Sequence, residues 1–205
     1  MIGLFGGTFN PVHIGHIRAA IDVRDQLSLS EVRMMPANIT PHRSQPGVSA
    51  RQRAAMLKLA IKDIAGLKYE GLELQRKQAS YTYDTLMILR ERIDEPIVLL
   101  MGADAFSNFP GWYRWKSILK LVNIAVLRRP GSRLSFAAFP EGWLQSRLVE
   151  KLDVKQGKII KVPISRTEVS SSEIRTRLQQ GKSIRYLVPE VVESYIADHG
   201  LYIEN

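Results

Sequence analysis

Continuous apolar runs alternate along most of the chain with segments in which apolar residues recur every three or four positions. The continuous runs are typical of buried strands in a parallel sheet, and the spaced residues are typical of helices that cover such a sheet. The predicted strands are Met1–Phe5, Glu31–Pro36, Leu67–Leu74, Pro96–Met101, Asn123–Leu127 and Lys158–Val162. The predicted helices run from near His13–Gly15 to before Ser28, from the capping box Ser49–Gln52 onward, from Ser80 to Ile93, from Gly102–Asp104 to about Leu121, and over Ser172–Gln180 and Pro189–His199.

The order of these elements predicts the fold class. Strand alternates with helix from the first residues, which indicates an α/β fold with a Rossmann-like open parallel sheet, helices on both faces and right-handed crossovers. We expect a single domain over residues 1–205, with a less regular segment near 131–155 that suits an insertion or flap. Ligands bind beyond the carboxyl ends of the strands in such sheets. That rule points to the loops Gly6–His16, Asn38–Arg43, Gly102–Asp104, Arg128–Gly131 and Ser165–Ser172.

The chain is basic overall, but its charge does not identify a partner. The chain of 205 residues carries 29 Lys and Arg against 20 Asp and Glu, for a net charge of +9. This balance favours an anionic partner, or it simply aids solubility. The basic residues are scattered and no nucleic-acid motif accompanies them, so we expect no nucleic-acid partner. The scattered set includes Arg51, Arg53, Arg90, Arg92, Lys116, Lys120, Arg128 and Arg129.

Cysteine is absent, which excludes disulfides, thiolate metal sites and a cysteine nucleophile. No signal-peptide pattern is present at the start, and no apolar run approaches the ~20 residues that span a bilayer. We therefore expect a cytoplasmic protein without a membrane partner, and a homo-oligomer is left open.

The turn after the first predicted strand holds the strongest chemical signal. Gly6 and Gly7 let the backbone approach a ligand and expose N–H groups to phosphate oxygens. His13 and His16 lie three positions apart at a helix start, so both imidazoles can share one face near the positive end of the helix dipole. Gly15 between them leaves room for a bulky ligand. The arrangement favours phosphate binding. The alternatives are that each histidine is a capping or core residue, or that the pair binds a metal, although no nearby carboxylate or third histidine completes a metal site.

A second cluster lies near the end of the chain. Arg175 sits one turn inside a predicted helix that begins at the serine run 170–172. Hydroxyl groups, backbone N–H groups and the guanidinium can then converge on phosphate oxygens. The alternative is that Arg175 is an ordinary solvated helix residue.

These two clusters carry a family resemblance. Residues 7–16 resemble the H-x-G-H signature of the nucleotidylyltransferase superfamily, and residues 169–175 resemble its second signature, I-S-S-T-x-I-R. Segments 36–43, 80–82 and 102–113 resemble the bacterial nicotinate-nucleotide adenylyltransferases, so that the resemblance covers nearly the whole chain. The departures are Asn10 for a frequent Asp, Thr40 for a usual Pro and Ser172 for Thr, and none removes a required donor.

The resemblance implies an enzyme that transfers AMP from ATP to nicotinate mononucleotide, with Mg²⁺ accompanying the ATP. The mononucleotide phosphate would attack the α-phosphorus in line and expel pyrophosphate, so catalysis would rest on positioning and charge stabilisation. The residues expected to stabilise that charge are His13, His16 and Arg175. The residues expected to bind ATP are Gly6, Gly7, Thr8, Phe9, Gly102, Asp104, Ser170, Ser171 and Ser172. The residues expected to bind the mononucleotide are Asn38, His42, Arg43, Thr82, Trp112 and Tyr113. No protein side chain is expected to ligate the metal.

Several of these assignments have simpler alternatives. Asp104, which the resemblance places on the ribose hydroxyls, could be only a helix N-cap. Trp112, placed on the pyridine ring with Thr82 and Tyr113 near the ring's carboxylate, could be a core aromatic. For the whole chain, the alternatives are an adenylyltransferase for nicotinamide mononucleotide or another acceptor, and a non-catalytic nucleotide- or nucleic-acid-binding domain.

Overall fold

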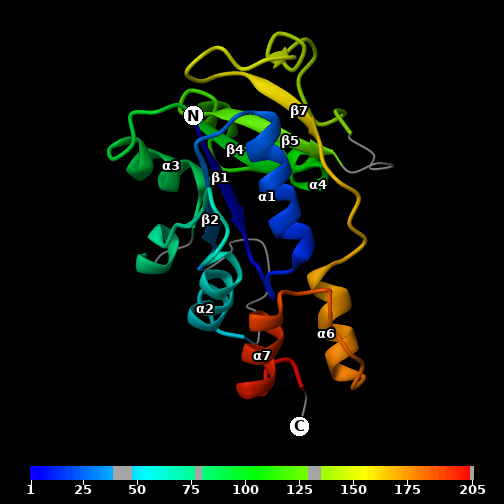
Figure 1. Ribbon diagram of the computed structural model, residues 1–205. Helices are drawn as coiled ribbons and strands as arrows, with labels where there is room; N and C mark the ends of the chain where they lie inside the picture. The colour runs from blue at the N-terminus through cyan, green and yellow to red at the C-terminus, as the bar shows by residue number, and fades with distance from the viewer. Residues whose placement is uncertain (39–47, 77–79, 129–134, 204–205) are drawn as a thin grey trace.

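The computed structural model of the chain describes residues 1–38, 48–76, 80–128 and 135–203. Within them, parallel strands form one seven-stranded sheet in the order β3-β2-β1-β4-β5-β7-β6 (Figure 1). The strands are β1 (Ile2–Gly7), β2 (Glu31–Pro36), β3 (Leu67–Tyr69), β4 (Ile97–Gly102), β5 (Asn123–Arg128), β6 (Leu148–Val149) and β7 (Ile159–Pro163). The helices are α1 (Ile14–Gln26), α2 (Ala50–Ile61), α3 (Thr82–Arg90), α4 (Ala103–Ser107), α5 (Trp115–Ile118), α6 (Ser171–Gln179) and α7 (Glu190–Asp198), with 3-10 helices η1 (Leu72–Gln75) and η2 (Phe109–Gly111). The predicted α/β fold with a parallel sheet is confirmed.

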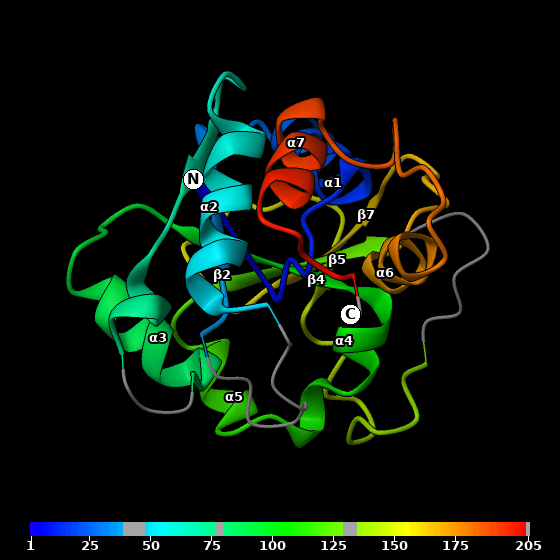
Figure 2. The same ribbon diagram turned by 90° about the horizontal axis from the view of Figure 1, so that it is seen from below.

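Two apolar clusters cover the two faces of the sheet. Along β4, Val98 and Leu100 belong to one cluster and Ile97 and Leu99 to the other, because successive strand residues point to opposite faces. Residues of α1, α2 and α7 belong to the first cluster and residues of α3, α4 and α5 to the second. Figure 2 shows these two groups of helices on opposite sides of the sheet. The sheet is therefore buried on both sides, which explains the continuous apolar runs in the sequence.

Local signals in the sequence locate most helix starts correctly. The Ser49 hydroxyl accepts a hydrogen bond from the Gln52 N–H at 3.2 Å, and the Gln52 carboxamide oxygen accepts one from the Ser49 N–H at 3.0 Å. This pair is the predicted capping box, and α2 begins at the next residue. Helix α1 begins at Ile14 with His13 as its N-cap, as the sequence also predicts.

Two predicted elements are wrong in extent. The strand expected over Leu67–Leu74 ends at Tyr69, because the Glu70 carboxylate accepts the Leu72 N–H at 3.1 Å and the chain turns into η1. The helix expected up to about Leu121 is broken into α4, η2 and α5. The break lies at Pro110–Gly111, where proline lacks the N–H that a helix interior requires.

The segment expected to be irregular is joined to the sheet. Its described part, from Ser135 onward, contains β6, which pairs in parallel with β7. Phe139 and Trp143 pack against Trp115 of α5, with ring centroids 5.9 Å and 4.6 Å apart. These aromatic contacts attach the segment to the second apolar cluster.

The strand order creates one place where the chain changes direction across the sheet. Strands β2 and β3 follow β1 on one side, whereas β4 and the later strands lie on the other. The loops that follow β1 and β4 therefore lead away from the carboxyl ends of these strands in opposite directions. Open parallel sheets bind ligands at such a point. Candidate loops Gly6–His16 and Gly102–Asp104 both start there.

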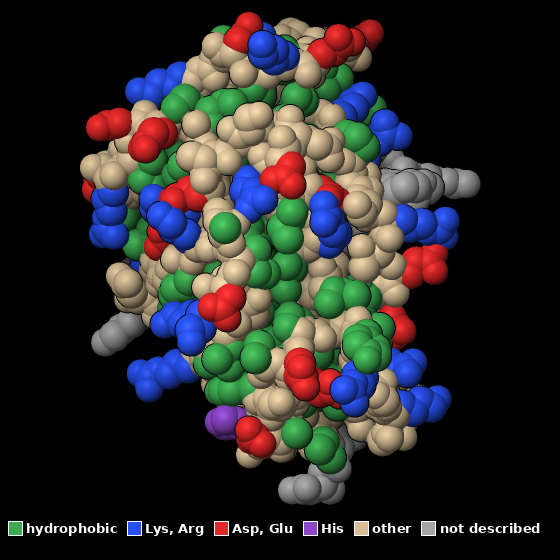
Figure 3. All heavy atoms as spheres, in the orientation of Figure 1, with side chains coloured by type: hydrophobic (Ala, Val, Ile, Leu, Met, Phe, Trp, Pro, Cys, Tyr) green, Lys and Arg blue, Asp and Glu red, His purple; other side chains and the backbone are tan. Residues whose placement is uncertain are grey.

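The displayed surface carries charges of both signs. On the face in Figure 3, Lys and Arg side chains lie scattered among Asp and Glu rather than gathered in one stripe. In the described part of the chain, no helix is long and apolar enough to cross a membrane.

Candidate active site

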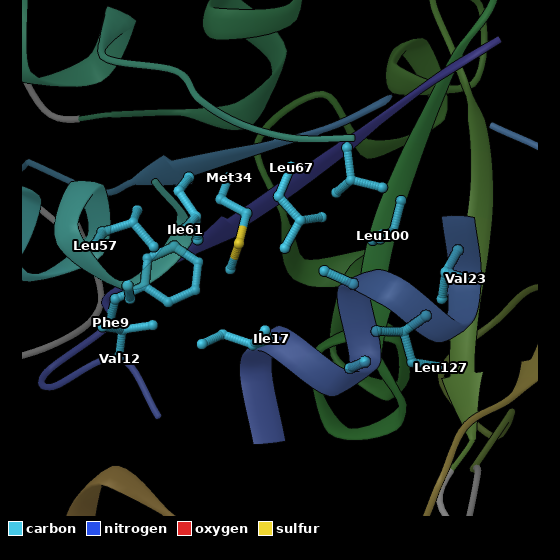
Figure 4. Packing of buried hydrophobic residues seen from close by; sticks show 14 of the residues in the cluster. Phe9, Val12, Ile17, Val23, Met34, Leu57, Ile61, Leu67, Leu100 and Leu127 are labelled. Atoms are coloured by element: carbon cyan, nitrogen blue, oxygen red, sulfur yellow. The ribbon is translucent and has the colours of Figure 1, made fainter. Parts of the chain in front are cut away.

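The loop after β1 is anchored in the apolar core by the side chain of Phe9. The Phe9 ring is 2% exposed and lies among Met34, Leu57 and Ile61 (Figure 4). A Cβ added to Gly7 would lie 3.0 Å from that ring, so a larger residue here would require the ring to shift by a few tenths of an ångström. The side chain of Phe9, which the sequence assigns to ATP binding, is thus in the core, and only its backbone can face a ligand.

The two histidines of this loop lie face to face. Their rings stack with centroids 3.7 Å apart and planes inclined by 30°. The His13 backbone N–H donates to Nδ1 of His16 at 3.3 Å. Since Nδ1 accepts, the proton of a neutral His16 ring is on Nε2, which makes Nε2 a hydrogen-bond donor. The pair stands at the N-terminus of α1, where the helix dipole favours an anion.

The metal alternative for this pair finds no further ligands. Among the residues that the structure describes, no group of three or more His, Asp or Glu side chains could hold a metal ion. Of the two, His13 is 3% exposed and is the N-cap of α1, so it lies at the edge of the core as well as beside His16.

The second signature docks directly on the first. The Ser171 hydroxyl donates to the Pro11 carbonyl at 2.9 Å, across 160 residues of sequence. Arg175 Nη1 donates to the Asn10 carbonyl at 2.8 Å, and Nη2 donates to the Ser172 hydroxyl at 3.2 Å. The two ends of the chain therefore form one constellation, as expected from the two motifs.

The N-terminus of α6 lies beside the same loop. The Ser170 hydroxyl accepts from the Glu173 N–H at 3.1 Å and caps the helix, as the serine run predicts. Gly15 of α1 packs against Val169, because a Cβ added there would lie 3.0 Å from Val169 Cγ1. Hydroxyls, helix N–H groups and a guanidinium thus lie beside the histidine turn.

The end of β4 lies next to the end of β1 in the sheet. Gly102 is exposed and serves as the N-cap of α4, and a Cβ added to it would meet nothing within 4 Å. Asp104 lies exposed in the first turn of that helix. The alternative in which Asp104 is the N-cap is wrong, and its carboxylate is left facing solvent.

The aromatic residues assigned to the acceptor lie together. The Tyr113 ring is 44% exposed and lies 4.9 Å from the Tyr81 ring, next to Thr82 at the start of α3. Trp112 is half-buried and meets Phe109 edge to face at 5.8 Å. Segments 80–82 and 112–113 are thus brought into contact, and Trp112 is not a fully buried core residue.

The last assigned loop is described only at its beginning. Asn38 follows β2, and its side-chain amide donates to the Arg76 carbonyl at 2.8 Å. His42 and Arg43, which the sequence assigns to the mononucleotide phosphate, lie outside the described residues.

The comparisons with known proteins agree with this geometry. Residues 4–177 match the family described as Cytidylyltransferase-like. A protein of Pseudomonas aeruginosa (strain UCBPP-PA14) named "Probable nicotinate-nucleotide adenylyltransferase" is 41% identical over 206 residues, covering 98% of this chain and 96% of its own. The protein of the same name from Hydrogenovibrio crunogenus is 38% identical over 203 residues, covering 98% and 97%. This chain belongs to the nicotinate-nucleotide adenylyltransferase family.

A solved structure supports the fold independently. Plasmodium falciparum nicotinic acid mononucleotide adenylyltransferase, complexed with NaAD, superposes with a TM-score of 0.75 over 98% of this chain and 96% of its own. The sequences are 18% identical, so this likeness bears on the fold alone. The resemblance read from the sequence signatures is confirmed.

Two side chains at this site, one buried and one half-buried, are not predicted from the sequence. Arg53 is one of the scattered positive charges of the sequence, yet its side chain is 1% exposed. Tyr202, in the C-terminal tail, donates its hydroxyl to Asn10 Oδ1 at 2.7 Å. Burial raises the pKa of Tyr202 despite the nearby Arg175 and Arg53 guanidinium groups. The helical spacing of Ala54 and Leu57 would have placed Arg53 near the buried face, but nothing local marked Tyr202.

Proposed function

We propose that this protein transfers AMP from ATP to nicotinate mononucleotide, giving deamido-NAD and pyrophosphate. The observation that carries the proposal is the docking of the Ser171 and Arg175 side chains on the Pro11 and Asn10 carbonyls of the histidine turn. The identity of about two residues in five with relatives named for this reaction supports the choice of substrates.

In the proposed reaction, a phosphate oxygen of the mononucleotide attacks the α-phosphorus of ATP in line, and pyrophosphate leaves. The attacking phosphate monoester is already ionised at neutral pH, so the chain need not supply a general base. His16 Nε2 and His13 stabilise the charge that develops at the α-phosphate, at the positive end of α1. Arg175 and the α6 N-terminus hold the β- and γ-phosphates that become pyrophosphate.

The remaining assigned residues hold the two substrates. Gly6, Gly7, Thr8 and the Phe9 backbone line the triphosphate, together with the Ser170–Ser172 run. Gly102 and Asp104 face the adenosine, with the Asp104 carboxylate on the ribose hydroxyls. Trp112 stacks on the pyridine ring while Thr82 and Tyr113 meet its carboxylate. Asn38, His42 and Arg43 are proposed for the mononucleotide end.

A divalent cation, Mg²⁺, is proposed to enter with ATP. Mg²⁺ prefers oxygen ligands and keeps several of its waters, so we propose that phosphate oxygens and water hold it. When bound, it neutralises charge on the triphosphate. We also propose that the reaction takes place in the cytoplasm. We propose that no nucleic acid takes part, because the basic residues are scattered along the sequence and no nucleic-acid-binding motif accompanies them.

The test is pyrophosphate release by the purified protein with ATP, Mg²⁺ and either nicotinate or nicotinamide mononucleotide. We expect a much higher kcat/KM for the acid, because a site built to hydrogen-bond a group rejects the analogue that lacks it. A reaction without the mononucleotide serves as the negative control. An equal or higher kcat/KM with the amide would contradict the acceptor and leave only an adenylyltransferase of another specificity.

A further inference from the structure

Arg53 is a buried cation that joins two loops of the site. It projects from α2, and its side chain is 1% exposed. Its Nη1 donates to the Thr8 carbonyl in the loop after β1. Its Nη2 donates to the Ala37 carbonyl at 2.7 Å and reaches the Asn38 carbonyl at 3.4 Å, both in the segment after β2. One guanidinium thus bridges the ends of two neighbouring strands.

The burial of this charge is expensive for the fold by itself. Among the described residues Arg53 has no ion pair, and its Nε has no hydrogen-bond partner. Burial also lowers the pKa of Arg53. An apolar side chain of similar size on this face of α2 would avoid that desolvation. Fold stability alone therefore does not account for an arginine here.

The hydrogen bond to Thr8 sets the direction of a peptide group. In a planar trans peptide the C=O and N–H point in opposite directions, so the Phe9 N–H points away from the Arg53 guanidinium. The Phe9 ring is in the core against Leu57 of the same helix (Figure 4), so its N–H is the part of Phe9 that can meet a phosphate. Arg53 thereby orients a donor of the phosphate-binding loop.

The same guanidinium ties this loop to the acceptor side. The Ala37 N–H donates to the Gly7 carbonyl at 2.9 Å, and Arg53 adds a second link through the Ala37 and Thr8 carbonyls. Asn38, which follows directly, is a residue proposed to hold the mononucleotide. A shift of Arg53 would therefore move both substrate loops together.

We propose that Arg53 is a positioning residue for adenylyl transfer. It holds the loop after β1, which we propose binds ATP, in a fixed position relative to the segment Ala37–Asn38 after β2, which we propose binds the mononucleotide. This inference rests on the proposed function. It assigns Arg53 no contact with either substrate.

The experiment compares Arg53→Met, which removes the charge, with Arg53→Lys, which keeps the charge but loses the planar fork. Arg51→Met is the matched control, because Arg51 is exposed on the same helix. We would measure kcat and KM for both substrates well below the melting temperature, and the rise in melting temperature that ATP alone causes. Misplacement of loops by up to 1 Å is expected to lower kcat/KM by about 10- to 100-fold for both substrates in Arg53→Met, and by less in Arg53→Lys.

Wild-type kcat/KM for both substrates in folded Arg53→Met, with only a lower melting temperature, would overturn the proposal. If Arg53→Met does not fold, Arg53→Lys decides in the same way. The rise in melting temperature with ATP alone measures ATP binding and not turnover. It therefore tests the role of Arg53 independently of the proposed reaction. A wild-type protein that binds ATP but does not use nicotinate mononucleotide would contradict the proposed function, while a weakened ATP response in the Arg53 variants would still support the positioning role.

Discussion

The contact between the two signatures predicts a defined effect of Gly15→Ala. Gly15 lies in the first turn of α1 between the two histidines. A Cβ added to it would lie 3.0 Å from Val169 Cγ1 and 3.1 Å from His13 Nδ1. Both distances are shorter than ordinary van der Waals contact, so one or both neighbours must move by a few tenths of an ångström. The His13 ring, stacked on His16 at 3.7 Å, would shift with respect to its partner.

The expected magnitudes differ for stability and for catalysis. Replacing glycine by alanine in a helix gains about 1 kcal/mol, whereas overpacking a buried contact costs roughly 1–3 kcal/mol. The net loss is then between about 0 and 2 kcal/mol, or at most about 8 °C in Tm for a chain of this size. Turnover should suffer more, because misplacement of a catalytic group by 1 Å can cost about 10²-fold. We expect kcat to fall by about tenfold or more.

The assay is pyrophosphate release together with thermal melts of Gly15→Ala, Val169→Ala and the double variant. Val169→Ala removes the nearer methyl group, so the double variant should recover part of the kcat that Gly15→Ala loses. Gly111→Ala is a suitable stability control, since a Cβ there meets nothing within 4 Å. An unchanged kcat and Tm in Gly15→Ala, or strict additivity in the double variant, would show that the two signatures do not press on each other at this point.

Four further substitutions test the site. His16→Ala should lower kcat by roughly 10²–10³ and weaken ATP binding far less, so an unchanged kcat would make His16 a structural cap. Trp112→Ala should raise KM for the mononucleotide with little loss of Tm, whereas a loss of about 3–5 kcal/mol with normal KM would rule out stacking. Arg175→Lys should impair turnover because the fork that spans Asn10 and Ser172 is lost, and full activity would exclude it from the site. Tyr202→Phe should cost about 1 kcal/mol, seen as a fall of a few degrees in Tm, and an unchanged Tm would mean that the bond to Asn10 contributes nothing.

The sequence alone determined the features whose partners are close along the chain. The apolar run Pro96–Met101 predicted a strand buried on both faces, and β4 lies there with apolar clusters on either side. Ser49 and Gln52 form their capping box within one turn. The three-residue spacing of His13 and His16 at a helix start was enough to predict that their rings share one face. In each case the interaction depends on backbone geometry that repeats within a few residues, so the pattern of residues encodes it.

Competing local signals in the sequence made the ends of one strand and one helix hard to predict. Leu67–Leu74 contains enough apolar residues for a strand, but Glu70 turns the chain into η1 by accepting the Leu72 N–H. The helix after β4 is broken at Pro110 and Gly111, although apolar residues continue at helical spacing beyond them. Apolar spacing reports which side chains are buried, and several local backbone paths satisfy the same burial.

Contacts between groups far apart in the sequence depend on the three-dimensional fold. The sequence signatures implied that Arg175 and the histidine turn share a site, but not that Arg175 is anchored on the Asn10 carbonyl. Arg53 reaches Thr8 across 45 residues, and Tyr202 reaches Asn10 across 192. A guanidinium or hydroxyl bonds to any carbonyl or amide oxygen within reach, so its residue type does not specify a partner. The partner is set by the order of strands in the sheet and by the packing of α2, α6 and the C-terminal tail against it, which no periodicity along the chain records.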